Sequence, residues 1–158
     1  MRSQTLRTAL VLLLLAVMSG AQANPAPKSA APDYSGRYSF LQEGEDLQLD
    51  INDGRVDGYI SRLGDTDTDR DTILNHYLAK ASLTGDKLTF TSKPVHAVWY
   101  EFSGTIGRGP AKSRAEDGYY QIVGTLIEHR QKNGKEESAR QREVTFKLFA
   151  DESAPTTK

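Results

Sequence analysis

The most conspicuous polar feature of this chain is a loop of alternating aspartates: Asp65, Asp67, Asp69 and Asp71. Carboxylate oxygens spaced in this way suit a hard cation such as Ca²⁺, which binds several oxygen ligands. An EF-hand loop that begins at Asp65 also needs a glycine and a glutamate where this chain has Arg70 and His76. The loop is therefore interpreted either as a solvated loop or as a weak calcium site, and no other cofactor is expected.

The histidines are the next candidates for chemistry, and none of the three lies in a catalytic motif. The sequence contains no HExxH motif and no Gly-x-Ser-x-Gly motif. We therefore assign no catalytic residue and expect a protein without enzymatic activity. His96, two residues after Pro94, is predicted on the inward face of its strand at the rim of the fold. There it would bond to the backbone, contact a ligand or bind a metal.

Three tyrosines share a predicted inward orientation: Tyr38, Tyr77 and Tyr100. Small residues are predicted on the same face: Gly58, Ala79, Ala81 and Gly104. Small residues inside a barrel either admit bulky neighbours or leave a cavity, and phenol groups would give such a cavity polar contacts. The predicted ligand-binding residues are thus the three tyrosines together with His96.

Composition excludes several classes of protein. The chain carries 20 basic and 21 acidic residues, so it has no basic field that would attract nucleic acid. Beyond the N-terminus it has no apolar run long enough for a membrane-spanning helix. It contains no cysteine, which rules out a disulfide, a zinc–thiolate site and a thiol nucleophile. The sequence therefore predicts a small globular domain.

The N-terminus has the features of a Sec-type signal peptide. Arg2 and Arg7 precede a short apolar stretch, and Ala21 and Ala23 supply the small residues that signal peptidase requires. We expect residues 1–23 to be removed and the protein to be exported to the periplasm or the medium.

The mature chain divides into three predicted parts. Residues 24–33 are rich in proline and alanine and are predicted to form a flexible linker. Residues 34–150 are predicted to form a single β-barrel domain, and residues 151–158 a disordered tail.

Turn signals in the folded part predict three hairpins, at Asp53-Gly54, Gly85-Asp86 and Gly44-Glu45. Centring the hairpins on these turns brings apolar residues together on one face of the sheet. The predicted cross-strand pairs are Leu49 with Gly58, Leu83 with Leu88, and Tyr38 with Ile51.

Two further elements leave alternatives open. Residues 72–78 fit either a strand or a helical turn. Around Asn133-Gly134, a plain turn places Val144 opposite Val123. A one-residue bulge would reverse that facing and turn the more apolar stripe around Ile122 toward the core.

These elements predict an all-β fold, an antiparallel up-and-down meander of about eight strands. Closure into a barrel would remove the two exposed sheet edges, so a closed barrel is preferred to the alternative, a two-sheet β-sandwich.

Two short motifs resemble the avidin and lipocalin group of small eight-stranded, calycin-type barrels. Residues 34–38 (YSGRY) are similar to the aromatic-x-Gly-x-aromatic opening of the first strand in those families. Residues 53–59 (DGRVDGY) resemble the second hairpin of avidin-like proteins. The resemblance implies the barrel fold. Those families place tryptophans in the ligand site, and this chain has only Trp99, so biotin is not carried over as a ligand.

The preferred functional hypothesis is a secreted, non-catalytic module that binds a small, partly apolar ligand inside the barrel. A filled core would favour an interaction protein that acts through its surface, with Trp99, predicted to point outward, as an anchor. An enzyme of unknown class is the third alternative and would need His96 inside the barrel.

Export predicts a defined mature N-terminus. Edman sequencing of the protein from its own source should begin at Asn24, because cleavage follows Ala23. A dominant species that retains Met1 would contradict the signal peptide.

Overall fold

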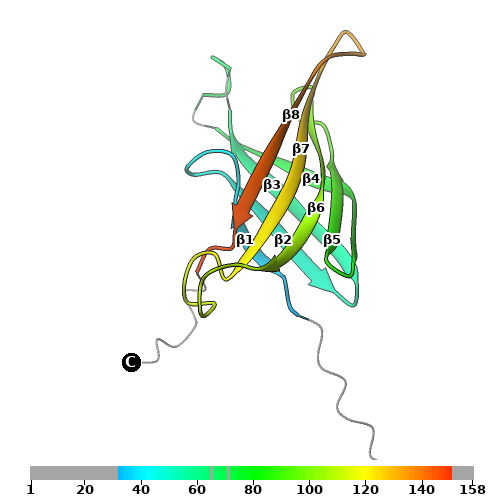
Figure 1. Ribbon diagram of the computed structural model, residues 1–158. Coiled ribbons are helices and arrows are strands. Elements are labelled where there is room, and N and C mark those ends of the chain that lie inside the picture. The colour runs from blue at the N-terminus through cyan, green and yellow to red at the C-terminus, as the bar shows by residue number, and fades with distance from the viewer. Residues whose placement is uncertain (1–31, 65, 71, 151–158) are drawn as a thin grey trace, which may run out of the picture. The chain divides into compact units, whose positions relative to one another are not determined.

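The computed structural model describes residues 32–64, 66–70 and 72–150, which form eight antiparallel strands joined in chain order (Figure 1). The strands are β1 (Gly36–Ser39), β2 (Asp46–Asn52), β3 (Arg55–Leu63), β4 (Ile73–Thr84), β5 (Lys87–Ser92), β6 (Val98–Arg108), β7 (Tyr120–Lys132) and β8 (Lys135–Lys147). The predicted all-β meander is confirmed. The predicted signal peptide, most of the linker and the C-terminal tail lie outside the described residues.

The sheet is a strongly curled half-barrel whose two edges meet at one point (Figure 1). Tyr38 of β1 forms an antiparallel bridge with Leu148, just after β8. The N–H of Phe149 donates to the carbonyl of Arg37 at 2.9 Å. The predicted closed barrel is thus realised as a half-barrel joined by a bridge, because β1 is only 4 residues long and offers little edge to pair.

Two of the three predicted hairpin registers are confirmed. Leu49 lies opposite Gly58, and Leu83 lies opposite Leu88. A Cβ at Gly58 would lie 2.0 Å from the backbone oxygen of Gln48, so the close approach of β2 and β3 requires glycine there.

The predicted register of the first hairpin is wrong, although its facing is right. Tyr38 lies opposite Leu47 instead of Ile51. The chain between β1 and β2 forms a wider loop, in which the N–H of Phe40 donates to the carbonyl of Glu45 at 3.2 Å. The shift spans an even number of residues, so the same side chains still point inward.

Strand β4 replaces the helical alternative for residues 72–78, and it contains a β-bulge between Leu78 and Lys80. A bulge adds one residue to one strand and so reverses the facing on its far side. Two odd-numbered residues on either side of the bulge therefore point to opposite faces. Ala81 packs against the core, whereas Tyr77 points outward with 55% of its surface exposed. The predicted inward orientation of Tyr77 is wrong for this reason.

A second bulge settles the facing of β7. The register between β7 and β8 shifts by one residue between Arg130 and Gln131. On the side of this bulge away from the turn, Ile122 lies opposite Phe146. Both side chains are fully buried. The bulged alternative is therefore confirmed, and the β7–β8 hairpin extends beyond its neighbours at one end of the sheet (Figure 1).

A single apolar core fills the concave side of the sheet. Its buried members are Tyr38, Phe40, Leu47, Leu49, Val56, Ile60, Leu88, Phe90, Tyr100, Phe102, Ile106, Tyr120, Ile122, Leu126, Phe146 and Leu148. The small residues admit bulky neighbours: a Cβ at Gly104 would lie 2.6 Å from Cζ of Phe102, and one at Gly124 would lie 3.0 Å from it. The ring of Phe102 therefore occupies the space above this glycine pair. None of the described residues belongs to a helix long and apolar enough to span a membrane.

The register of β2 can be tested with two adjacent substitutions. Leu49 is fully buried, so Leu49→Asp should lower the free energy of unfolding by on the order of 3 kcal/mol or more, through an unpaired buried charge. Gln48 lies on the outer face, and Gln48→Asp should cost less than about 0.5 kcal/mol. Urea denaturation measures both, and equal losses would contradict the facing of β2.

Candidate functional site

The predicted ligand-binding tyrosines Tyr38 and Tyr100 are both fully buried, and each hydroxyl is already bonded within the protein. The hydroxyl of Tyr38 donates to the carbonyl of Tyr34 at 2.7 Å. Burial raises the pKa of the Tyr38 phenol well above its usual value. The hydroxyl of Tyr100 contacts the guanidinium of Arg62, and burial raises its pKa to about 12. Both tyrosines are parts of a packed interior.

The structure does not bring the other two predicted ligand residues into this interior. Tyr77 lies on the outer face of β4, beyond the bulge. His96 lies in the turn before β6, with a φ of 47°, and its side chain is 55% exposed. Its predicted place on an inward strand face is wrong, because the strand begins only at Val98.

A buried polar cluster occupies one end of the core, and sequence reasoning did not predict it. Arg62 of β3 lies between Glu45 and Tyr100, and its Nε donates to Oε1 of Glu45 at 3.0 Å. His76 of β4 packs edge-on against Tyr100, with ring centroids 5.2 Å apart. Glu45, Arg62 and His76 are each less than one tenth exposed. The cluster thus joins the β1–β2 loop, β3, β4 and β6.

The charges of this cluster depend on one another. Burial lowers the pKa of Arg62, but Tyr100 and Glu45 outweigh that effect and hold the pKa above its usual value. Among the described residues, Oε2 of Glu45 and Nδ1 of His76 have no hydrogen-bond partner. An unpaired buried polar atom costs about 1–3 kcal/mol, so each position would accept a water molecule where there is room for one.

A second buried carboxylate lies on the inner side of β7. Oε1 of Glu128 accepts a hydrogen bond from Nε of Arg130 at 3.0 Å, and Oε2 accepts one from Arg142 at 3.3 Å. Glu128 also acts electrostatically on Tyr100, whose pKa it raises further. The two carboxylates and their arginines make this end of the interior polar, whereas the remainder is apolar.

The aspartate loop can be described only in part, since Asp65 and Asp71 lie outside the described residues. Asp67 pairs with Arg70 at 2.8 Å. Oδ2 of Asp69 lies 2.7 Å from Nδ1 of His96. In the described part of the chain, no three His, Cys, Asp or Glu side chains gather as metal ligands would. The calcium site therefore stays a prediction.

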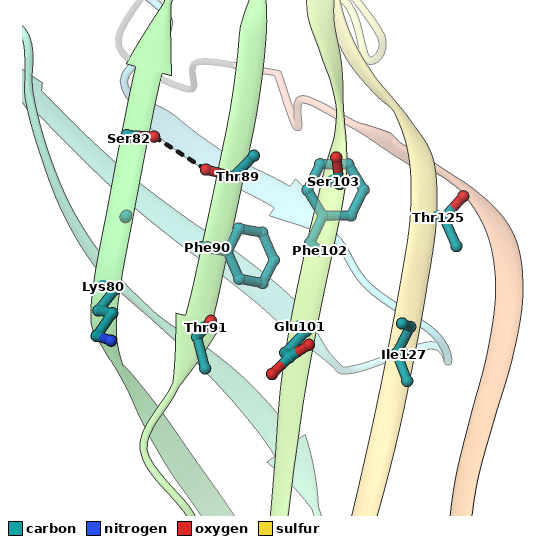
Figure 2. Close-up of a pocket in the computed structure, with 11 residues that line it drawn as sticks. Lys80, Ser82, Thr89, Phe90, Thr91, Glu101, Phe102, Ser103, Thr125 and Ile127 are labelled. Atoms are coloured by element: carbon teal, nitrogen blue, oxygen red, sulfur yellow. Dashed lines mark hydrogen bonds between the residues drawn. The ribbon is translucent and has the colours of Figure 1, made fainter.

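The outer face of the sheet carries a shallow hollow across four strands, which we call the β4–β7 hollow (Figure 2). Its volume is about 370 Å³. It is lined by Lys80, Ala81, Ser82, Thr89, Phe90, Thr91, Glu101, Phe102, Ser103, Thr125 and Ile127. Figure 2 shows the labelled side chains spread over neighbouring strands, so the hollow is built by strand pairing and by no single loop.

Hydroxyl groups from four strands form one row across this hollow, because the strand registers align them. Ser82 and Thr89 bond to each other at 2.9 Å (Figure 2). Thr125 donates to Glu143 at 2.6 Å. The hydroxyl of Ser103, in the middle of the row, has no hydrogen bond to any side chain in the described part of the chain. It is therefore free to bond to a ligand.

Trp99 extends the outer face of β6 beyond this hollow. Its ring stacks on His129 of β7, with centroids 4.8 Å apart and planes 4° from parallel. Nε2 of His129 lies 3.5 Å from the carboxylate of Glu101, which lines the hollow. The predicted outward orientation of Trp99 is confirmed.

Comparison with known proteins adds no relative. No protein-family model, curated protein or solved structure matches this chain. The eight-stranded antiparallel half-barrel is compatible with a calycin-like fold, and the architecture is established by the coordinates alone.

Sequence reasoning missed the buried polar cluster, although part of the signal was present. The predicted pair of Leu49 with Gly58 turns position 58 inward, and alternation along the same strand gives Arg62 the same facing. The position of Arg62 could therefore have been inferred from the alternation. Its partner Glu45 could not, because its burial depends on how the β1–β2 loop folds over the end of the sheet.

His76 predicts a pH dependence of stability. Burial, together with the charge of Arg62, lowers the pKa of His76 below 6.5. Near pH 6.5 the unfolded chain therefore binds a proton on His76, whereas the folded protein does not. The folded state is thus destabilised relative to the unfolded state as the pH falls below 6.5. The loss is at most about 1.4 kcal/mol per pH unit. In urea denaturation between about pH 7 and pH 5, His76→Gln should flatten this profile.

The exposed Asn75, next to His76 on β4, supplies the control for this measurement. Asn75→Gln removes no titrating group and should leave the slope of the pH profile unchanged. A His76→Gln profile parallel to that of the parent protein would show that His76 does not control the acid sensitivity.

Proposed function

We propose that this protein is an exported, non-catalytic binding protein of calycin type that holds its ligand on the outer face of the sheet. The observation that carries the proposal is the β4–β7 hollow, where hydroxyl groups from four strands line one depression. The interior is the less favourable place for a ligand, because Tyr38 and Tyr100 are fully buried and internally bonded.

The lining of the hollow indicates the chemistry of its ligand. Ile127 supplies apolar contact, while Ser103 supplies a free hydroxyl. Lys80 and Glu101 add one charge of each sign, so the hollow does not select strongly for an anion or a cation. These properties fit a small, partly apolar molecule that carries hydrogen-bonding groups.

The Trp99–His129 stack favours the same face as a surface for recognition. A half-buried tryptophan beside a site is a common anchor for a partner. The stack belongs to strands β6 and β7, which also line the hollow. A ligand longer than the hollow would therefore reach an aromatic surface at that end.

Binding in the hollow can be tested by a fragment screen followed by ¹⁵N NMR. Partly apolar fragments should bind with Kd values of about 1 mM, which corresponds to a binding free energy of about −4 kcal/mol. They should shift the amide signals of Thr89, Ser103 and Thr125. Ser103→Phe fills the centre of the hollow and should weaken these fragments by about tenfold or more. Phenylalanine is well tolerated in strands, so the variant should fold.

Thr145→Phe is the matched control, because Thr145 lies on the outer face of the neighbouring strand β8 and outside the hollow. It should leave the affinities unchanged. A screen in which every fragment maps to other residues, or in which both variants behave alike, would refute the site.

A further inference from the structure

A second outer surface, on strands β2, β3 and β4, carries two tyrosines side by side. Tyr59 and Tyr77 lie opposite each other in the strand register, with ring centroids 5.7 Å apart and planes inclined at 55°. Tyr77 is 55% exposed. Within the described ranges, neither tyrosine makes a hydrogen bond through its side chain, and each has the other as its ring contact. Tyr59 is half-buried. An exposed aromatic ring beside a second ring on the same face is a typical feature of a recognition surface.

The two rings border a hollow of about 530 Å³, which we call the tyrosine hollow. Gln48 continues the row of Tyr59 and Tyr77 onto a third strand, because the registers place all three residues in line. Lys93 lies at the other side, where its backbone N–H donates to the carbonyl of Tyr77 at 2.7 Å. Asp50 and Asp57, which lie opposite each other on β2 and β3, complete the rim.

The rim is rich in hydrogen-bonding groups and nearly neutral. Gln48 supplies an amide, Asp50 and Asp57 two carboxylates, and Lys93 an ammonium group. Asp57 is paired with Arg55 at 2.9 Å, so Arg55 and Lys93 together balance the two carboxylates. Such a rim can both donate and accept hydrogen bonds but gives little attraction to a strongly charged ligand.

We propose that the tyrosine hollow binds a neutral saccharide. A pyranose ring has an apolar face of C–H groups and a rim of hydroxyls that donate and accept hydrogen bonds. The exposed ring of Tyr77 and the half-buried ring of Tyr59 match the apolar face, and the amide, carboxylate and ammonium groups match the hydroxyls. An apolar protein segment would leave these rim groups desolvated and unpaired, at a cost that the two rings alone would not offset.

This site goes beyond the proposed function. It shares only strand β4 with the β4–β7 hollow, and the two hollows have no lining residue in common. The two sites can be tested separately. A result at the tyrosine hollow does not depend on whether fragments bind at Ser103.

The test uses three neutral probes, cellohexaose, hexa-N-acetylchitohexaose and maltohexaose, followed by ¹⁵N NMR. At least one should bind with a Kd of about 1 mM or tighter and should shift the amide signals of Gln48, Tyr59 and Tyr77. Tyr77→Ala should weaken binding by about tenfold or more. Tyr77→Phe keeps the ring and should stay within about threefold of the parent protein.

Ile73→Ala is the matched control, because Ile73 lies on the same strand and is 63% exposed. It should leave saccharide binding unchanged. The proposal is overturned if none of the probes shifts these signals at about 10 mM, well above the affinity expected. It is also overturned if Tyr77→Ala binds like the parent, or if the hollow takes up only an apolar dye such as Nile red.

Discussion

Each side chain of the half-barrel is placed inside or outside by the pleat of the strand that carries it, and this alternation controls everything else in the structure. Successive residues point to opposite faces, so one inserted residue exchanges the two faces for the remainder of a strand. The described strands contain two such insertions, in β4 and between β7 and β8. The bulge after Leu78 turns Tyr77 outward while keeping Ala81 inside, and the bulge after Arg130 turns Ile122 toward Phe146.

The polar groups in the packed interior must find their partners within the protein. Arg62 lies inside because its strand places it there, and Glu45 and Tyr100 compensate its charge. Removing one partner of such a buried pair commonly costs about 3–5 kcal/mol, because the other charge is left without compensation. The cluster therefore fixes how the β1–β2 loop lies over the end of the sheet. It also places the neutral His76 beside a permanent positive charge.

A filled core moves recognition to the outer face of the sheet. The β4–β7 hollow is lined by hydroxyls and a pair of opposite charges, whereas the tyrosine hollow is lined by two aromatic rings with a polar rim. Both are shallow hollows made mainly by aligned residues of neighbouring strands, so the strand register decides which side chains line them. Amphipathic hollows of this kind suit ligands that are only partly apolar.

The sequence by itself determined the strands, the tight hairpins at Gly54 and Gly85, and the inward facing of Tyr38 and Tyr100. These depend on local turn geometry and alternation, which act over a few residues. Only the tertiary structure decided the facing of Tyr77 and the pairing of Arg62 with Glu45. A bulge has no strong local signature, and the buried pair joins residues that are distant in the chain. The surface hollows likewise arise only when three or four strands are placed in register, since no single segment contains the row of side chains that lines them.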